Sequence, residues 1–202
     1  MDFDDYLIDA QLHIKTTGRD NSCADDLCSP YEPTSYSVLA RLAESGYVTG
    51  ENHLVDYGSG LGRVPIYLAD KTGCHATGVE MMRRFHEKAL RNLESYLDGM
   101  ENAAIDFYNQ KAQDFVLPDE ADLLFFFNPF HSRTFKSVMT NVIASFRKAP
   151  RRIRLFFYYP HDSYIAFLSS VPEVMFFDEI DCTDLFREED DRNRIMIFEM
   201  EP

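Results

Sequence analysis

The sequence predicts an α/β fold in which helices cover both faces of a mainly parallel sheet. From residue 53 onward, short apolar runs alternate with segments of helical periodicity, which is typical of parallel strands joined by helices. Two apolar runs near the end, 174–180 and 195–200, have no helical pattern between them and predict a closing antiparallel hairpin. The run 122–127 is almost continuously apolar, as expected of a central strand covered on both faces.

The N-terminal part of the chain is expected to be helical. Apolar residues recur at helical spacing over 2–15, and again over 35–45, where Gly46 ends the pattern. The segment between them, 16–30, is polar and contains Gly18 and Pro30, so it is expected to be a loop.

The later elements follow in strict alternation. Strands are expected at 53–57, 75–80, 105–108, 122–127, 153–159, 174–180 and 195–200. Helices are expected at 63–71, at 83–97, along the apolar stripe from Phe135 to Phe146, and at 162–168, which Asp162 can cap. In such sheets ligands bind outside the carboxyl ends of the strands, where the strand order reverses. Functional residues are therefore expected in the loops that directly follow strands.

Composition restricts the classes of partner. Asp and Glu number 34 against 20 Lys and Arg, a formal net charge of −14, which disfavours duplex nucleic acid and anionic membrane surfaces. With 17 Phe and 11 Tyr the chain is expected to fold around a core. The acidic N-terminus does not resemble a leader, and the apolar runs are too short to span a bilayer. A cytoplasmic protein with reduced cysteines is therefore expected. Cys23 and Cys28 have no matching pair of Cys or His ligands elsewhere, so no metal site is expected there.

A glycine-rich loop follows the first strand. The segment from Asp56 to Gly62 has glycine at every second position, which lets the backbone turn tightly and approach a ligand. Arg63 stands where the dinucleotide-binding fingerprint has its last glycine, so the pattern is G-x-G-x-G. Glu80 ends the next strand, where a carboxylate can accept hydrogen bonds from two ribose hydroxyls. The alternative for the loop alone is an ordinary strand-to-helix turn.

Over residues 50–200 the chain resembles the class I S-adenosylmethionine-dependent methyltransferases. The resemblance rests on the loop 55–62, the acidic strand end 78–80, the corner 128–130 and the closing hairpin. It implies a Rossmann-like, doubly wound, seven-stranded sheet with a terminal antiparallel hairpin, and S-adenosylmethionine as cofactor. Lys111 replaces the acidic residue that many members have before Ala112. The cofactor-binding residues it implies are Asp56, Gly58, Ser59, Gly60, Gly62, Glu80, Met81, Ala112, Gln113 and Asn128.

The corner Asn128-Pro129-Phe130 ends the central strand and is the candidate catalytic site. It is similar to the Asn/Asp-Pro-Pro-Tyr/Phe corner of members that methylate nitrogen, shortened by one proline. An amide oxygen and a backbone carbonyl can accept N–H bonds from an amine, and an aromatic face can steady a developing cation. The alternative is a simple turn that ends the strand.

A second segment, Tyr31-Glu32-Pro33-Thr34, resembles one that precedes the glycine loop in the non-SET lysine methyltransferase group and helps to cover the cofactor. Tyr31 and Thr34 are therefore further candidates for cofactor contact, with helix capping as the alternative. Tyr159 is a candidate for the substrate pocket and His131 for a base. Arg63 is expected either to meet a carboxylate or to be exposed.

These observations predict an S-adenosylmethionine-dependent methyltransferase that acts on an amine nitrogen of a small molecule or of a protein side chain. Residues 1–50 are expected to form a helical extension over the site, and 51–202 the catalytic core. The protein is expected to be a monomer or homodimer. The alternatives are a non-catalytic cofactor-binding member of the fold and a nucleotide-dependent oxidoreductase, against which Arg63 argues.

Overall fold

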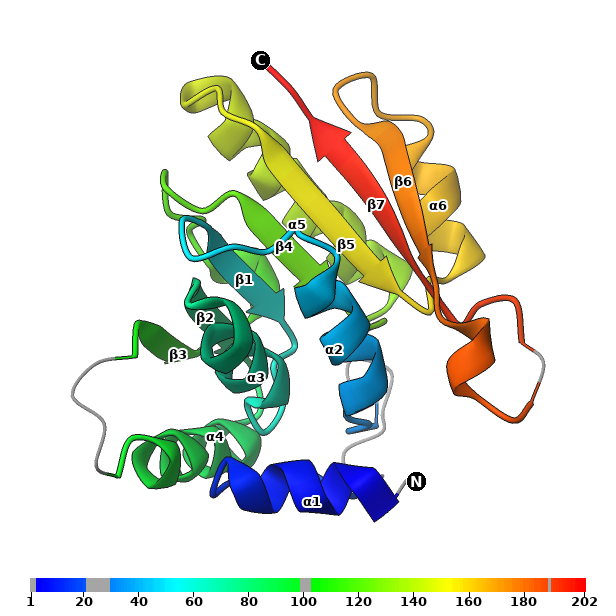
Figure 1. Ribbon diagram of the computed structural model, residues 1–202. Helices are drawn as coiled ribbons and strands as arrows, with labels where there is room; N and C mark the ends of the chain where they lie inside the picture. Colours follow the sequence, from blue (N-terminus) through cyan, green and yellow to red (C-terminus); the bar gives the residue numbers. More distant parts are fainter. Residues whose placement is uncertain (1–2, 21–29, 99–102, 189) are drawn as a thin grey trace.

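The computed structural model describes residues 3–20, 30–98, 103–188 and 190–202 (Figure 1). Cys23 and Cys28 lie outside these ranges. No helix within the described ranges is long and apolar enough to cross a membrane.

The centre of the fold is a seven-stranded sheet with the strand order β3-β2-β1-β4-β5-β7-β6 (Figure 1). The strands are β1 (His53–Tyr57), β2 (His75–Glu80), β3 (Ile105–Asn109), β4 (Leu123–Phe126), β5 (Ile153–Tyr158), β6 (Met175–Asp181) and β7 (Arg194–Met200). The first five run parallel, and β7 lies antiparallel between β5 and β6. The strand order reverses between β1 and β4, so the ligand site is expected at the carboxyl ends of those two strands.

Helices cover both faces of the sheet, which confirms the predicted fold class. They are α1 (Phe3–Gln11), α2 (Tyr36–Glu44), α3 (Arg63–Thr72), α4 (Arg83–Tyr96), α5 (Ser132–Lys148) and α6 (Asp162–Leu168), with short 3-10 turns η1 (Ala112–Asp114) and η2 (Thr183–Leu185). Leu54 of β1 and Phe125 of β4 share one apolar cluster with α2 and α3, whereas Val55 and Phe126 share a second with α5 and α6. Neighbouring residues of a strand thus enter opposite clusters, as the pleat requires.

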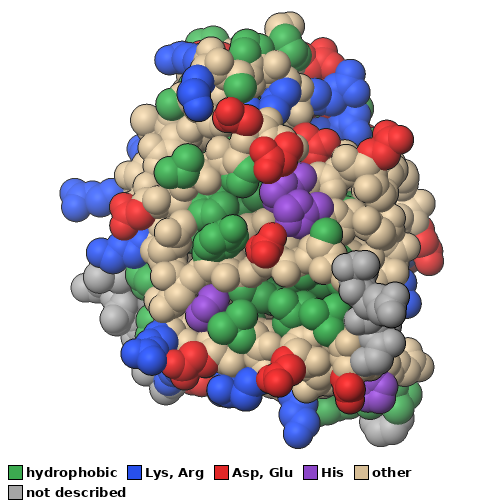
Figure 2. Space-filling model, turned by 90° about the vertical axis from the view of Figure 1, so that its left-hand side faces the viewer, with side chains coloured by type: hydrophobic (Ala, Val, Ile, Leu, Met, Phe, Trp, Pro, Cys, Tyr) green, Lys and Arg blue, Asp and Glu red, His purple; other side chains and the backbone are tan. Residues whose placement is uncertain are grey.

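One side of the molecule is formed around β3, an edge strand. Figure 2 views the side that lies on the left in Figure 1 and shows hydrophobic side chains in the middle of this face with charged side chains of both signs around them. Tyr108 of β3 and Leu90 of α4 are among the large hydrophobic residues that are exposed. Basic and acidic groups are interspersed here, so this face presents no continuous basic surface (Figure 2).

Two local predictions were wrong. The first helix ends at Gln11 and does not reach residue 15, because the Asp9 carboxylate accepts the backbone N–H groups of Thr16 and Thr17 at 2.6 and 2.7 Å and turns the chain back. Asp162 does not cap α6: the N-cap is His161, with no side-chain cap bond, and Asp162 lies in the first turn. There its negative charge faces the positive end of the helix dipole.

Candidate active site

A cavity of about 810 Å³ opens at the carboxyl ends of the central strands, where the reversal of strand order predicts a ligand. Its wall is built from the glycine loop after β1, the end of β2, the corner after β4, the end of β5, and the segment from Pro30 to Thr34. The volume lies in the upper part of the range for small-molecule sites. The cavity can therefore hold a cofactor together with the reacting end of a second molecule.

The glycine loop holds three segments in close contact. The backbone N–H groups of Gly58 and Ser59 both donate to the carbonyl of Val79, at 2.8 and 3.1 Å, which ties the loop to β2. Gly58 and Gly60 have φ values of 83° and 54°, a region that side chains disfavour. A Cβ on Gly58 would lie 2.4 Å from Cβ of Pro129, and one on Gly60 would lie 2.5 Å from Cε2 of Tyr31. Glycine at both positions therefore brings the Pro129 corner and the Tyr31 segment against the loop.

Glu80 is positioned at the end of β2 by backbone donors. One carboxylate oxygen accepts the N–H of Gly60 at 3.0 Å, and the other accepts the N–H of Met82 at 2.6 Å. Burial raises the pKa of this carboxyl above its usual value despite these bonds. Because a carboxylate has about four acceptor sites, both oxygens can still accept from a pair of vicinal hydroxyls.

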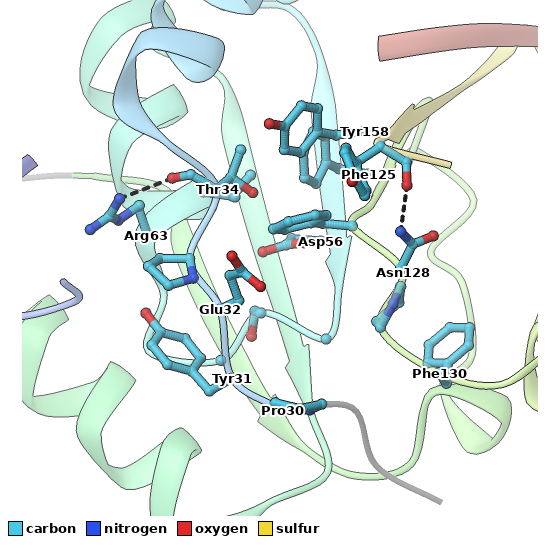
Figure 3. Close-up of a pocket in the computed structure, with 18 of the residues that line it drawn as sticks. Pro30, Tyr31, Glu32, Thr34, Asp56, Arg63, Phe125, Asn128, Phe130 and Tyr158 are labelled. Carbon is cyan, nitrogen blue, oxygen red and sulfur yellow. Dashed lines mark hydrogen bonds between the residues drawn. The ribbon is translucent and has the colours of Figure 1, made fainter. Parts of the chain in front are cut away.

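Asp56 supplies a second buried carboxyl to the same cavity. Its pKa is raised well above the ordinary range by complete burial and by the negative charge of Glu80. Figure 3 shows Asp56 near the middle of the cavity, with Glu32 and Tyr31 to one side and Asn128 to the other. Two neighbouring acids in one cavity favour a ligand that carries positive charge, since a cation would offset both.

Arg63 meets carboxylates, one of the two alternatives that the sequence left open. It is 2% exposed, and one guanidinium N–H group donates to Oδ2 of Asp5 at 2.8 Å and to the carbonyl of Thr34 at 3.0 Å. Two further groups donate to the hydroxyls of Thr16 and Thr17, each at 2.7 Å. The first residue after the glycine loop thus holds the N-terminal part of the chain against the cavity.

The segment of residues 31–34, which we call the strap, covers the glycine loop. The Tyr31 ring lies over Gly60, and its hydroxyl donates to the carbonyl of Thr16 at 2.5 Å. Figure 3 shows the bond from Arg63 that fixes the other end of the strap at Thr34. Ser35 is the N-cap residue of α2 but makes no side-chain cap bond, so capping by Ser35 does not explain this segment.

The corner after β4 has an unusual backbone. Asn128 has a φ of 42°, and its amide N–H donates to the carbonyl of Tyr159, as Figure 3 shows. The N–H of His161 in turn donates to the Asn128 amide oxygen at 3.2 Å. The Tyr164 hydroxyl donates to the carbonyl of Phe130. The corner is therefore a strand-ending turn that also lines the cavity.

Nearly all candidate residues from the sequence lie on this one cavity. Those that line it are Tyr31, Thr34, Asp56, Gly58, Ser59, Gly60, Glu80, Met81, Ala112, Gln113, Asn128, Pro129 and Phe130. Gly62 does not: it is the N-cap residue of α3, and a Cβ there would lie 2.6 Å from Cζ of Phe107, so this glycine serves the packing of α3 on the sheet. His131 is the N-cap residue of α5 and does not line the cavity either, whereas Tyr159 does.

Sequence reasoning missed a group of aromatic and charged wall residues. They are Phe85, Phe125, Phe127, Tyr158, Phe186, Arg19, Glu32, Lys111, Arg187, Glu188 and Asp190. Phe125, Phe127 and Tyr158 lie at or near the ends of apolar runs, and this position near strand ends was the available signal. The only sequence signal from the loop between β6 and β7 was its acidic composition, which usually indicates a solvated surface loop.

The fold and the cavity define a class I S-adenosylmethionine-dependent methyltransferase. The family model described as histone methylation protein DOT1 matches residues 29–165, and the chain belongs to this family. A comparison with curated proteins gives no match.

Solved structures of low sequence identity share the fold. One is an RNA methyltransferase from Salinibacter ruber in complex with S-adenosylhomocysteine, with 19% identity over 84% of this chain and 94% of that one and a TM-score of 0.53. Another is magnesium protoporphyrin IX methyltransferase from Synechocystis with bound S-adenosylmethionine, with 18% identity, 83% and 77% coverage, and a TM-score of 0.57. A third, from Streptococcus agalactiae, is described as a protein in the NADB-Rossmann superfamily, with 19% identity, 84% and 70% coverage, and a TM-score of 0.60.

The chain is therefore an enzyme that transfers a methyl group from S-adenosylmethionine. The cavity fits this cofactor on independent physical grounds. Glu80 has acceptor capacity left for ribose hydroxyls, and the buried pair of Asp56 and Glu80 is offset by the positive charges that S-adenosylmethionine carries on its sulfonium and ammonium groups.

Proposed function

We propose that the enzyme methylates an amine nitrogen, either on a side chain of a basic protein segment or on a small molecule. The observation that carries this proposal is the contact between the corner and the cofactor loop. Pro129 packs directly on Gly58, and Asn128, Pro129 and Phe130 line the same cavity as Asp56 and Glu80. A group bound beside the corner is therefore next to the glycine loop.

The proposed cofactor site is the half of the cavity under the strap. Glu80 accepts the ribose hydroxyls, Asp56 attracts the ammonium group, and the glycine-loop backbone leaves room for the ligand. Bound S-adenosylmethionine supplies an electrophilic methyl group on a sulfonium. The complete proposed cofactor set is Tyr31, Thr34, Asp56, Gly58, Ser59, Gly60, Glu80, Met81, Ala112, Gln113 and Asn128.

The other half of the cavity suits an amine acceptor. Its wall includes Phe127, Tyr158 and Tyr159, whose faces favour a cation, and the acidic residues Glu188 and Asp190. The net charge of −14 attracts a positively charged molecule from a distance. These features favour an acceptor with an apolar stem and a cationic head, such as a lysine side chain.

The Asn128 side chain aims the acceptor in this proposal. Its amide oxygen accepts from the N–H of His161 at 3.2 Å, and the side chain lines the cavity next to Pro129, so it can orient an amine from this wall. The cationic head must first lose a proton to water, and the neutral amine that results has the lone pair that attacks the methyl group. Orientation of this amine then lowers the barrier without a strong base. Phe130 excludes water beside the reacting group, since it is buried and lines the cavity.

We further propose that residues 1–50 form the cover of this site and residues 51–202 the core, and that the enzyme acts in the cytoplasm. The strap over Gly60 and the bonds of Arg63 to the N-terminal part support the first statement. The buried thiols of Cys74 and Cys182, which are not joined in a disulfide, support the second.

The experiment is transfer of tritiated methyl groups from S-adenosylmethionine to defined acceptors. Poly-lysine, a lysine-rich peptide and a polyamine are compared with an arginine-rich peptide and duplex DNA. We expect label only on the amine acceptors, and label on the arginine-rich peptide alone or on DNA alone would contradict the proposal. Asn128→Ala is expected to lower turnover at least about tenfold while S-adenosylhomocysteine still binds.

A further inference from the structure

The loop between β6 and β7 reaches the acceptor half of the cavity and is fastened there. The Tyr159 hydroxyl donates to Oδ2 of Asp190 at 2.5 Å. The Arg192 side chain donates to both oxygens of Asp190, at 3.2 and 3.0 Å, and its guanidinium carbon lies 4.4 Å from the centre of the Tyr159 ring. Tyr159, Asp190 and Arg192 thus contact one another pairwise. We call these three residues the clamp.

The backbone of Tyr159 connects the clamp to Asn128. Tyr159 has a φ of 50°, a conformation that a tyrosine keeps only when its surroundings hold it. Its N–H donates to the carbonyl of Arg194 on β7 at 3.1 Å, and its carbonyl accepts the Asn128 amide N–H. The N–H of His161, two residues further along, donates to the Asn128 amide oxygen. Both ends of the Asn128 amide are therefore oriented by the segment that the clamp holds.

We propose that Tyr159 is a positioning residue for methyl transfer, and that Asp190 and Arg192 hold it so that the Asn128 amide keeps one orientation toward the acceptor. The inference rests on the proposed amine acceptor. It assigns a role to the loop after β6, which would otherwise be a solvated acidic connection. It also explains why two neighbouring strand ends, at Asn128 and Tyr159, both have left-handed backbone.

The charge state of the clamp supports this role. Hydrogen bonds from Arg192 and from the Tyr159 hydroxyl hold the pKa of Asp190 far below its usual value, which favours the charged carboxylate as their acceptor. Asp184, on the same loop, pairs instead with Arg41 at 2.5 and 2.8 Å and does not line the cavity. Asp184 of the loop and Arg41 of α2 therefore form a second Asp–Arg pair, one that does not contact Tyr159 or Asn128.

The test measures binding and needs no natural acceptor. The probe is an S-adenosylhomocysteine analogue in which a nitrogen replaces the sulfur and carries a short aminoalkyl chain, so that it occupies both halves of the cavity. Calorimetry compares this probe with S-adenosylhomocysteine in the wild type, in Tyr159→Phe and in Asp190→Asn. Asp184→Asn is the matched control, because it changes the other loop aspartate that pairs with an arginine, here Arg41 of α2.

In the wild type the probe is expected to bind more tightly than S-adenosylhomocysteine. In Tyr159→Phe and Asp190→Asn this advantage should shrink about tenfold, while S-adenosylhomocysteine affinity stays within about twofold and Asp184→Asn behaves as the wild type. If the probe still binds more tightly than S-adenosylhomocysteine by the wild-type factor in both variants, the role of the clamp is refuted, while the proposed amine acceptor is unaffected. Equal losses for both ligands would also refute the role of the clamp, since they indicate a general structural role. A wild type that gives the probe no advantage would instead contradict the proposed amine acceptor.

Discussion

Replacing Arg63 by methionine should destabilise the enzyme strongly, because the side chain is a buried cation with partners from several segments. The change keeps a similar length but removes the bonds to Asp5, Thr34, Thr16 and Thr17. It also leaves Asp5 and Asp9 buried without the guanidinium that lies 2.8 and 3.9 Å from their oxygens. Removal of one partner of a buried ion pair costs about 3–5 kcal/mol.

That loss is a large part of the free energy of unfolding of a typical domain, about 5–15 kcal/mol. For a chain of this size it corresponds to a fall in melting temperature of about 6–20 °C. Urea unfolding and a thermal melt followed by circular dichroism measure both quantities. Arg41→Met is the matched control: its pair with Asp184 is exposed at the surface and should contribute no more than about 1 kcal/mol.

The same substitution should weaken S-adenosylhomocysteine binding about tenfold or more, because the strap loses its bond at Thr34 and becomes easier to displace from the glycine loop. Calorimetry at a temperature where the variant is folded measures this effect. If Arg63→Met unfolds with a free energy within about 1 kcal/mol of the wild type, the buried cluster is not the source of stability that we describe.

Three further predictions concern the cofactor half. Glu80→Gln should weaken S-adenosylhomocysteine binding at least about tenfold, because an amide replaces one acceptor oxygen by a donor, whereas Glu87→Gln, which alters an exposed pair with Arg83, should not. Gly60→Ala should abolish binding, since its Cβ would meet the Tyr31 ring, whereas Gly46→Ala, with a φ of 79° and open space around it, incurs backbone strain alone. In ligand-free protein, the raised pKa of Glu80 means that the folded state binds this proton more tightly than the unfolded state. The group's contribution to the free energy of unfolding is therefore fully present below its ordinary pKa of 4.5. It is lost as the pH rises through the higher pKa of the folded state. Glu80→Gln should flatten that dependence in urea titrations.

Each of these predictions has an outcome that would contradict it. Wild-type affinity in Glu80→Gln would remove this residue from the ribose site. Equal effects of the two glycine variants would show that strain, and not the contact with Tyr31, limits position 60. A pH dependence that persists unchanged in Glu80→Gln would assign it to another group, with Asp56 the next candidate because burial raises its pKa as well.

Local patterns predicted much of the fold. The predicted bounds of β1, β2 and α6 agree with the structure, because each apolar run is bounded by residues that interrupt it, such as Gly58 and Pro160. The glycine loop and Glu80 were predictable because they lie at the carboxyl ends of two predicted strands, where ligands bind in such sheets. The end of α1 was not, because it depends on a side-chain bond from Asp9 to the backbone of Thr16 that periodicity does not contain.

The contacts of the site that the sequence did not predict join distant segments. Arg63 and Asp5 are 58 positions apart, and Tyr159 and Asp190 are 31 positions apart. No local pattern distinguishes Asp190, which holds Tyr159, from Asp184, which pairs with Arg41 at the surface. The strand order and the path of the loop after β6 decide which carboxylate faces the cavity.

A crystal structure with the aminoalkyl analogue of S-adenosylhomocysteine would test the account most directly, because this one ligand occupies both the cofactor and the acceptor positions. We expect its ribose hydroxyls on the Glu80 carboxylate and its amine between Asn128 and the wall formed by Tyr159 and Asp190. A ribose away from Glu80, or an aminoalkyl chain that leaves the cavity without passing Asn128, would contradict the proposed transfer of a methyl group to an amine at this corner.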